Sequence, residues 1–255
     1  MADSRPKALT IAGFDPSGGA GVLADSKTFI ALGCSASAVI TSITYQNSER
    51  VFGALHQTAE AVRDQIMPLL AEPFACVKTG MLPTREVVNE VARVLRETAL
   101  PSPVVDPVII SSSGQRLMDE EALETLVGEL LPLACLVTPN IPEAERLTGI
   151  EIESEATMRR AATAIRGMGA RAVLIKGGHL TSKHSVHESE DAIDVLDNEG
   201  VVTVFRHKRV PNVELHGTGC MLSAAIAAEL GKGMALEDSV GAAKQFVWDA
   251  IRQFA

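Results

Sequence analysis

The segment His216-Gly217-Thr218-Gly219-Cys220 places two glycines and a thiol directly before a run of small, helix-compatible residues. Glycines let the backbone turn tightly, and the first turn of a helix presents unpaired N–H groups beside a partial positive charge. A phosphoryl group would fit this cradle. The same helix start favours the thiolate of Cys220, so we expect this side chain to abstract a proton. A glycine-rich turn around a buried cysteine is the structural alternative.

A second glycine-rich segment runs from Gly13 to Gly21, after an apolar run and before a helical stretch that contains Asp25. We expect it to lie at a ligand site, because glycines allow a close approach of the backbone. The segment has neither the G-x-G-x-x-G spacing of dinucleotide-binding loops nor the G-K-[ST] ending of a P-loop. A tight packing turn is the alternative interpretation.

Two further polar segments follow apolar runs. Gln46 comes soon after the run at 36–41, and its amide suits one edge of a nitrogen heterocycle. Met81 ends the segment Lys78-Thr79-Gly80-Met81 and offers an adaptable apolar wall. In isolation, Gln46 is better explained as a solvated loop residue, and only its place beside the other motifs favours a binding role.

Charged side chains also occur within or just after apolar runs. Asp106 interrupts a Val- and Ile-rich run, and an unpaired charge there would be costly, which favours a nearby metal ion or cation. Asn140 and Glu143 follow another run and suit a hydrated metal-phosphate group, although helix capping explains them equally well. Lys176 precedes two glycines and would neutralise phosphate oxygens, with a plain strand-ending lysine as the alternative.

The elements that position these residues alternate between short apolar runs and amphipathic stretches. This alternation predicts an α/β fold with a mostly parallel, doubly wound sheet and helices on both faces. Ligands bind such sheets beyond the carboxyl ends of the strands. Within 191–210, residues 192–196 and 201–205 flank a turn and predict a small antiparallel edge hairpin, while 180–190 reads as a surface loop. The expected strands are 8–12, 36–41, 76–79, 104–110, 135–138 and 172–176.

Composition narrows the function classes. The 255 residues are 46% hydrophobic and 22% charged, typical of a globular protein, and we expect one domain over 1–255. A net charge of −9 with one Trp and one Tyr argues against a nucleic-acid partner. With no long apolar run and four widely spaced cysteines, we expect a cytoplasmic protein that is not membrane-bound and has reduced thiols.

Taken together, these segments resemble the hydroxymethylpyrimidine/phosphomethylpyrimidine kinases of thiamine biosynthesis, a branch of the ribokinase-like superfamily. The resemblance runs nearly from end to end, and the motifs follow the family's order. They are A-G-x-D-P-S-G-G-A-G, A-D-x-K-T-F, T-x-Q-N, K-x-G-M-L, D-P-V, T-P-N-x-x-E, V-L-x-K-G-G-H and H-G-T-G-C-x-L-S-A-A.

The resemblance implies a ribokinase-like fold that uses ATP and Mg2+ to phosphorylate 4-amino-5-hydroxymethyl-2-methylpyrimidine and then its monophosphate. It implies that Cys220 is the base. By the same resemblance, the Gly217, Thr218, Gly219 and Cys220 amides and Lys176 stabilise the transferred phosphoryl group. The further roles it implies are pyrimidine binding by Gln46, Gly13, Asp25, Met81 and Val108, nucleotide contacts by Lys176, Asn140, Glu143 and Gly219, and a magnesium-phosphate region at Asp106, Asn140 and Glu143, with Asp106 and Glu143 as the metal ligands.

The chain departs from the family pattern at Phe14, Tyr45, Leu215 and Met221. Phe14 and Tyr45 lie near the expected ring site, so the departures concern the heterocycle more than the reaction. Pyridoxal kinase activity is the nearest alternative, and a non-catalytic ligand-binding protein on the same fold is the alternative from another class. We expect a small hydroxymethyl heterocycle as substrate and a homodimer as the assembly.

Overall fold

The computed structural model of this chain describes residues 5–47, 50–111, 114–178, 191–208 and 217–253. The expected surface loop at 180–190 lies outside the described residues, as does His216 of the glycine-rich segment.

One sheet forms the centre of the molecule. Within the described ranges it has nine strands in the order β3-β2-β1-β4-β5-β6-β7-β8-β9. The pairs from β2 through β7 are parallel, whereas β3, β8 and β9 pair antiparallel with their neighbours. The strands are β1 (Lys7–Phe14), β2 (Ser35–Gln46), β3 (Val51–His56), β4 (Cys76–Thr79), β5 (Val104–Val105), β6 (Leu136–Val137), β7 (Ala172–Ile175), β8 (Asp191–Asn198) and β9 (Val201–Lys208). The mostly parallel sheet and its edge hairpin β8–β9 are confirmed.

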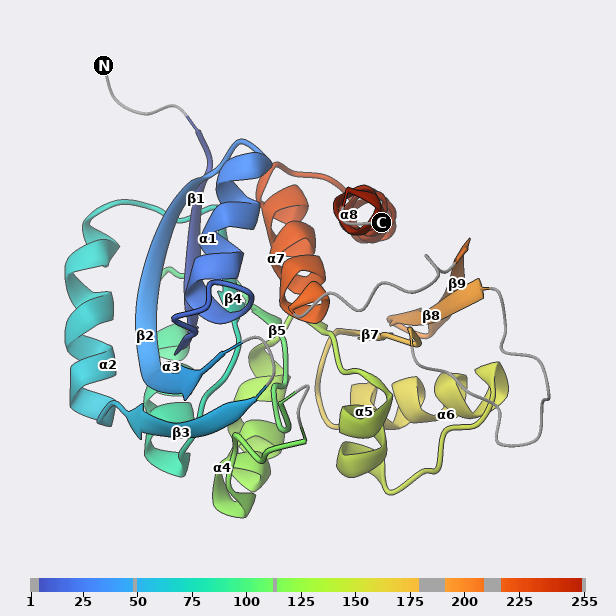
Figure 1. Ribbon diagram of the computed structural model, residues 1–255, viewed down its shortest axis with the longest axis horizontal. Helices are drawn as coiled ribbons and strands as arrows, with labels where there is room; N and C mark the ends of the chain where they lie inside the picture. The colour runs from blue at the N-terminus through green and yellow to red at the C-terminus, as the bar shows by residue number, and fades with distance from the viewer. Residues whose placement is uncertain (1–4, 48–49, 112–113, 179–190, 209–216, 254–255) are drawn as a thin grey trace.

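Helices cover both faces of the sheet, as expected for a doubly wound fold (Figure 1). Helices α1, α7 and α8 lie on one face, and α2 to α6 lie on the other. The helices are α1 (Gly21–Ala31), α2 (Ala59–Ile66), α3 (Arg85–Glu97), α4 (Glu120–Thr125), α5 (Ile141–Thr148), α6 (Glu155–Arg166), α7 (Thr218–Gly231) and α8 (Leu236–Arg252). None of these described helices is long and apolar enough to cross a bilayer.

Side-chain alternation along the parallel strands divides the core into two clusters. In β4, Cys76 packs with the α1, α7 and α8 side chains, and its neighbour Val77 packs with those of α2 to α6. The same division separates Leu136 from Val137 in β6. Successive strand residues point to opposite faces, and here both faces are apolar because helices bury both.

Three strands differ from the sequence-based expectation. Strand β2 continues to Gln46, so Gln46 ends a strand instead of lying in a loop after it. Strand β5 stops at Val105, because Asp106 precedes Pro107, which has no N–H to donate to a sheet. Strand β3 was not expected, since most of its side chains are at least partly exposed and it lacks a buried apolar run.

Helices α3 and α6 each bury one apolar stripe in the core, as expected for the amphipathic stretches between the strands. Helix α7 is different, because residues 222–229 are all buried. It packs against α1 and α8 as well as strands β1, β4 and β5. A helix enclosed on most sides needs small residues, which explains the alanine-rich sequence that follows Cys220.

Helix α1 offers a direct test of the core between the sheet and α7. Phe29 is fully buried, whereas its neighbour Ile30 is 57% exposed. We predict that Phe29→Ala lowers the free energy of unfolding by about 3–5 kcal/mol because it leaves a cavity. Urea denaturation followed by circular dichroism measures this change. Ile30→Ala is the matched control and should change the value by less than about 1 kcal/mol; equal effects would contradict the packing described.

Candidate active site

The parallel strands carry a row of polar side chains, which lies at the carboxyl ends of β4 to β7 and in the middle of the longer strand β1. On each strand the polar residue lies two positions after a side chain of the α1, α7 and α8 core, so both point to the same face. Ladder pairing brings neighbouring members together, for example Thr10 opposite Lys78. The row consists of Thr10, Lys78, Asp106, Thr138 and Lys176, following Ala8, Cys76, Val104, Leu136 and Leu174.

An ion pair without solvent contact lies at the base of this row. Lys78 Nζ donates hydrogen bonds to both carboxylate oxygens of Asp25, at 3.0 and 2.9 Å. Thr10 Oγ1 donates a third to Asp25 Oδ2 at 2.6 Å. Burial lowers the pKa of Lys78, but Asp25 and the nearby Cys220 and Asp106 outweigh it and raise that pKa above its ordinary value. The Lys78 ammonium is therefore charged inside the protein.

A second lysine reaches the row from the end of β7. Lys176 Nζ donates to Asp106 Oδ1 at 2.8 Å, and Lys78 Nζ lies 4.0 Å from Asp106 Oδ2. Burial would raise the pKa of Asp106, but Lys176 and Lys78, with a hydrogen bond from Cys220, hold it below its ordinary value. The Asp106 carboxylate thus lies between two cations.

The backbone around Lys176 is held on both sides. Lys176 N donates to Pro139 O at 2.8 Å, and Gly177 N donates to Asp194 Oδ1 at 2.8 Å. A Cβ on Gly177 would lie 1.8 Å from the carbonyl oxygen of Ile193, so only glycine fits there. These contacts direct the Lys176 ammonium toward Gly219, where an added Cβ would lie 3.2 Å from Nζ.

Helix α7 begins at Thr218, directly beside the glycine-rich loop after β1. Gly217 has a φ of +85°, and a Cβ there would lie 1.8 Å from the carbonyl oxygen of Gly19. The helix start is tied to the sheet by Ser223, whose Oγ lies 2.8 Å from Thr138 Oγ1 and donates to Gly219 O at 2.9 Å. The expected cradle is therefore a helix start with Lys176 beside it.

Cys220 lies in the first turn of α7, as predicted, but its thiol does not have the predicted acidity. Burial raises the pKa of Cys220 to about 12, with Asp106 and Asp25 adding to the rise and Lys78 and Lys176 opposing it. The expectation that the helix start favours the thiolate is wrong. Loss of hydration outweighs the helix dipole, so the S–H stays protonated and hydrogen-bonds to Asp106.

Asn140 and Glu143 form a capping box at the start of α5. Asn140 Oδ1 accepts from Glu143 N, and Glu143 Oε2 accepts from Asn140 N, each at 2.8 Å. Capping, the structural alternative, is thus part of their role. Burial raises the pKa of Glu143 to about 7, Lys176 opposes this rise, and the charge of Asp106 adds to it. A cation near these two carboxylates would relieve that repulsion.

The residues expected to hold the ring form two contacts above this charged row. Gln46 makes a side-chain hydrogen bond to Asp15 in the glycine-rich loop. A Cβ on Gly13 would lie 3.1 Å from Met81 Sδ, so Gly13 and Met81 touch. Val108 is half-buried beyond Asp106, and its N–H donates to the Asp106 carbonyl oxygen at 2.8 Å.

Asp25 occupies a different environment from the other expected ring-binding residues. It is fully buried, and its carboxylate oxygens already accept the bonds from Lys78 and Thr10. In this structure Asp25 therefore holds Lys78 in place.

Sequence reasoning did not select Lys78 or Asp15. Lys78 is a charge within the buried strand Cys76–Thr79, which is the same signal that pointed to Asp106. Asp15 Oδ1 accepts from Ser17 N and Oγ, and Oδ2 accepts from Ala20 N, so it organises the glycine-rich loop. The Asp-Pro-Ser sequence is typical of such turns.

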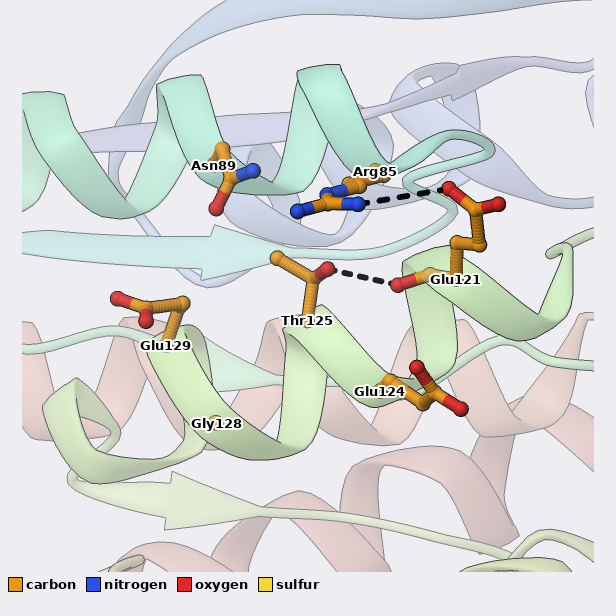
Figure 2. Close-up of a pocket in the computed structure, with 7 residues that line it drawn as sticks. All are labelled: Arg85, Asn89, Glu121, Glu124, Thr125, Gly128 and Glu129. Carbon is orange, nitrogen blue, oxygen red and sulfur yellow. Dashed lines mark hydrogen bonds and ion pairs between the residues drawn. The ribbon is translucent and has the colours of Figure 1, made fainter.

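A surface hollow of about 270 Å³ lies apart from this row, between α3 and the α4 region (Figure 2). It contains the Arg85–Glu121 ion pair, at 3.6 Å, and none of the predicted site residues. Both partners are more than half exposed, so their interaction is weak. The lining residues are Arg85, Asn89, Glu121, Glu124, Thr125, Gly128 and Glu129.

Known proteins resemble the chain over nearly its full length. The hydroxymethylpyrimidine/phosphomethylpyrimidine kinase of Streptomyces coelicolor is 43% identical over 96% of this chain and 88% of its own. The crystal structure of phosphomethylpyrimidine kinase from Clostridium difficile superposes with a TM-score of 0.83 at 38% identity, covering 97% of this chain and all of that one.

A pyridoxal kinase shares the same fold. The Staphylococcus aureus enzyme, in complex with AMP-PCP and pyridoxal, superposes with a TM-score of 0.87 at 31% identity, covering 97% of this chain and 88% of that one. A sequence model described as phosphomethylpyrimidine kinase matches residues 15–255 of this chain. With this match, and with the row of strand-end side chains in place, the chain belongs to the phosphomethylpyrimidine kinase family of ribokinase-like enzymes.

Proposed function

We propose that the protein transfers the γ-phosphoryl group of ATP to 4-amino-5-hydroxymethyl-2-methylpyrimidine and then to its monophosphate, in thiamine biosynthesis. The observation that carries this proposal is the meeting of Lys176, Asp106 and the first turn of α7 at the carboxyl edge of a parallel sheet. The named activity of the Streptomyces coelicolor relative and the nucleotide analogue bound by the Staphylococcus aureus neighbour support it.

In this reaction the chain mainly positions and neutralises charge. The amides of Gly217, Thr218, Gly219 and Cys220 face the transferred phosphoryl group, and the helix dipole favours its negative charge. Lys176 adds a cation beside Gly219. Phosphoryl transfer needs little covalent help from the protein, so this electrostatic contribution is the largest.

Cys220 is the proposed base for the hydroxymethyl group. Burial raises the pKa of its thiol to about 12, so Cys220 accepts the substrate proton only after its own proton has left to solvent. Asp106 accepts the thiol's hydrogen bond, but Lys176 and Lys78 hold the pKa of its carboxyl group below the ordinary value, so Asp106 stays ionised and orients the thiol. The hydroxyl proton then moves to sulfur as the oxygen–phosphorus bond forms, which fits the late proton loss of a loose transition state.

Magnesium is proposed to bind near Asp106 and Glu143. Within the described ranges no cluster of three or more His, Cys, Asp or Glu residues could hold a metal by itself. Two carboxylates nevertheless suit Mg2+, which usually binds one or two of them together with substrate phosphates. Burial and the nearby charge of Asp106 raise the pKa of Glu143, and a cation bound there would offset both effects, which supports the proposal. When bound, the ion would neutralise phosphate oxygens, with Asn140 and Lys176 as further nucleotide contacts.

A pyridoxal-type ring is the second candidate substrate. Tyr45 is 52% exposed at the end of β2, next to Gln46, and differs from the family pattern. A larger aromatic neighbour beside the ring-binding amide alters which heterocycle packs there. The pyridoxal complex of the Staphylococcus aureus neighbour shows that this fold accommodates that ring in a related enzyme.

We also propose that residues 1–255 form one kinase domain that acts as a cytoplasmic homodimer. The β2–β3 hairpin supports the dimer, because Ile43, Tyr45 and Leu55 expose apolar surface at the edge of the sheet. Ile43 and Leu55 are register partners on one face of that hairpin. Light scattering measures the mass directly, and a monomer at micromolar concentration would contradict this assembly.

The substrate assignment predicts ADP release with hydroxymethylpyrimidine and with its monophosphate. We expect kcat/KM for the pyrimidine to exceed that for pyridoxal and pyridoxine, since Gln46 pairs with an edge of the pyrimidine. A coupled ADP assay with these compounds measures the ratio. Turnover of pyridoxal alone would select the second candidate, and binding without any turnover would support a non-catalytic protein.

The proposed base predicts a change in turnover without a matching change in binding. Cys220→Ala should lower kcat by roughly 10²–10⁴-fold while KM changes much less, because proton transfer occurs only in the transition state. Steady-state kinetics measure both constants. Cys34→Ala is the control, since Cys34 is buried beneath α1 and away from the site. Unchanged turnover in Cys220→Ala would remove this residue from the mechanism.

The magnesium proposal predicts a pH dependence that belongs to Glu143. Its pKa is raised to about 7, so below that pH Mg2+ must displace a proton, and above it the carboxylate is free to bind. Between pH 6 and 8 the Mg2+ concentration for half-maximal activity should fall about tenfold more in the native protein than in Glu143→Gln. If this Mg2+ concentration changed equally with pH in the native protein and in Glu143→Gln, Glu143 would not be a metal ligand.

A further inference from the structure

Lys78 has no role in the reaction proposed above, although its position is costly. Its side chain is fully buried, and so is that of its partner Asp25. Removing two charges from water costs more than a simple ion pair returns, and an apolar pair of similar volume is often at least as stable. Stability therefore does not explain why the chain has a buried ion pair between Lys78 and Asp25.

The charges around Asp106 suggest a functional role for Lys78. Its carboxylate has two lysines, Lys176 at 2.8 Å from Oδ1 and Lys78 at 4.0 Å from Oδ2. These lysines differ in freedom. The Lys176 side chain is 12% exposed and lies next to Gly219 in the anion cradle. The Lys78 side chain is enclosed and held by two hydrogen bonds to Asp25, so it cannot follow a ligand.

A difficulty arises when Lys176 serves a phosphate. Turning its ammonium toward the nucleotide takes a close cation away from Asp106, whose exposed fraction is only 2%. A buried carboxylate that loses its partner is strongly unfavourable, so Asp106 would retain Lys176 unless another positive charge stayed in place. Lys78 supplies this charge from the chain itself, before any Mg2+ reaches Asp106.

We propose that Lys78 is a positioning residue that keeps the Asp106 carboxylate paired while Lys176 moves to the nucleotide phosphates. This inference rests on the proposed function, because it assumes that Lys176 contacts the nucleotide. Asp25 and Thr10 hold the Lys78 ammonium at its distance from Asp106. Lys78 thus acts on the nucleotide only through Lys176 and never touches it.

A double-mutant cycle tests this indirect action. Binding of AMP-PCP, measured by titration calorimetry without the heterocycle and without Mg2+, is compared in native protein, Lys78→Met, Lys176→Met and the double variant. We expect Lys78→Met to weaken binding by about tenfold or more when Lys176 is present, the scale of a charged hydrogen bond. In the Lys176→Met background the same change should weaken binding by less than about twofold, because no lysine remains to be released.

Additive losses in this cycle would overturn the inference and indicate a general structural role for Lys78. Lys78→Arg keeps the positive charge and should bind AMP-PCP within about threefold of the native protein. A loss in Lys78→Arg equal to that in Lys78→Met would likewise overturn it, since charge is the property proposed to matter.

Circular dichroism checks that each variant folds, and a second pair of variants removes the Lys78 charge without leaving Asp25 unpaired. If Lys78→Met does not fold, the cycle is run with Lys78→Met/Asp25→Asn against Asp25→Asn, which leaves no unpaired carboxylate at Asp25. Native protein that binds no AMP-PCP would overturn the proposed function as well. Native protein that binds and turns over the pyrimidine, with additive variants, would overturn only the role of Lys78.

Discussion

The site depends on one geometric constraint, the alternation of side chains in parallel strands that are buried on both faces. Because every second residue points toward α1, α7 and α8, a polar residue placed two positions after a core residue must face the same helices. The sheet applies this rule from β1 to β7, so Thr10, Lys78, Asp106, Thr138 and Lys176 form one row. Helix α7 then covers that row with its first turn.

Within the row, charge balance limits what each group can do. Two lysines and two carboxylates share a space with little water, and Cys220 lies among them. Every charge there depends on its neighbours, as the shifted pKa values of Asp106, Glu143 and Cys220 show. A ligand with phosphate groups must therefore redistribute these contacts and cannot simply add one more.

Much of this arrangement was readable from the sequence. Apolar runs located the parallel strands, and residues at their ends located Asp106, Asn140 and Lys176. The environment of each of these side chains was harder to predict from the sequence. The helix start suggested an acidic Cys220, but the desolvation that reverses this depends on how tightly α7 packs, which no local pattern reveals. Strand β3 escaped prediction because it lies at an edge and needs no apolar alternation. Lys78 was not predicted, because the pattern Lys78-Thr79-Gly80-Met81 indicates an apolar wall at Met81 and does not reveal the buried partner Asp25.

The contact between Gly217 and Gly19 determines when the active site can assemble during synthesis of the chain. These glycines lie near opposite ends of the chain, yet their backbones touch so closely that no side chain fits between them. Helix α7 also covers strands β1, β4 and β5. On a ribosome, the loop after β1 emerges early and has no partner until α7 follows. The catalytic centre therefore cannot form until α7 has been synthesised, by which point every strand of the described sheet is already present in the chain.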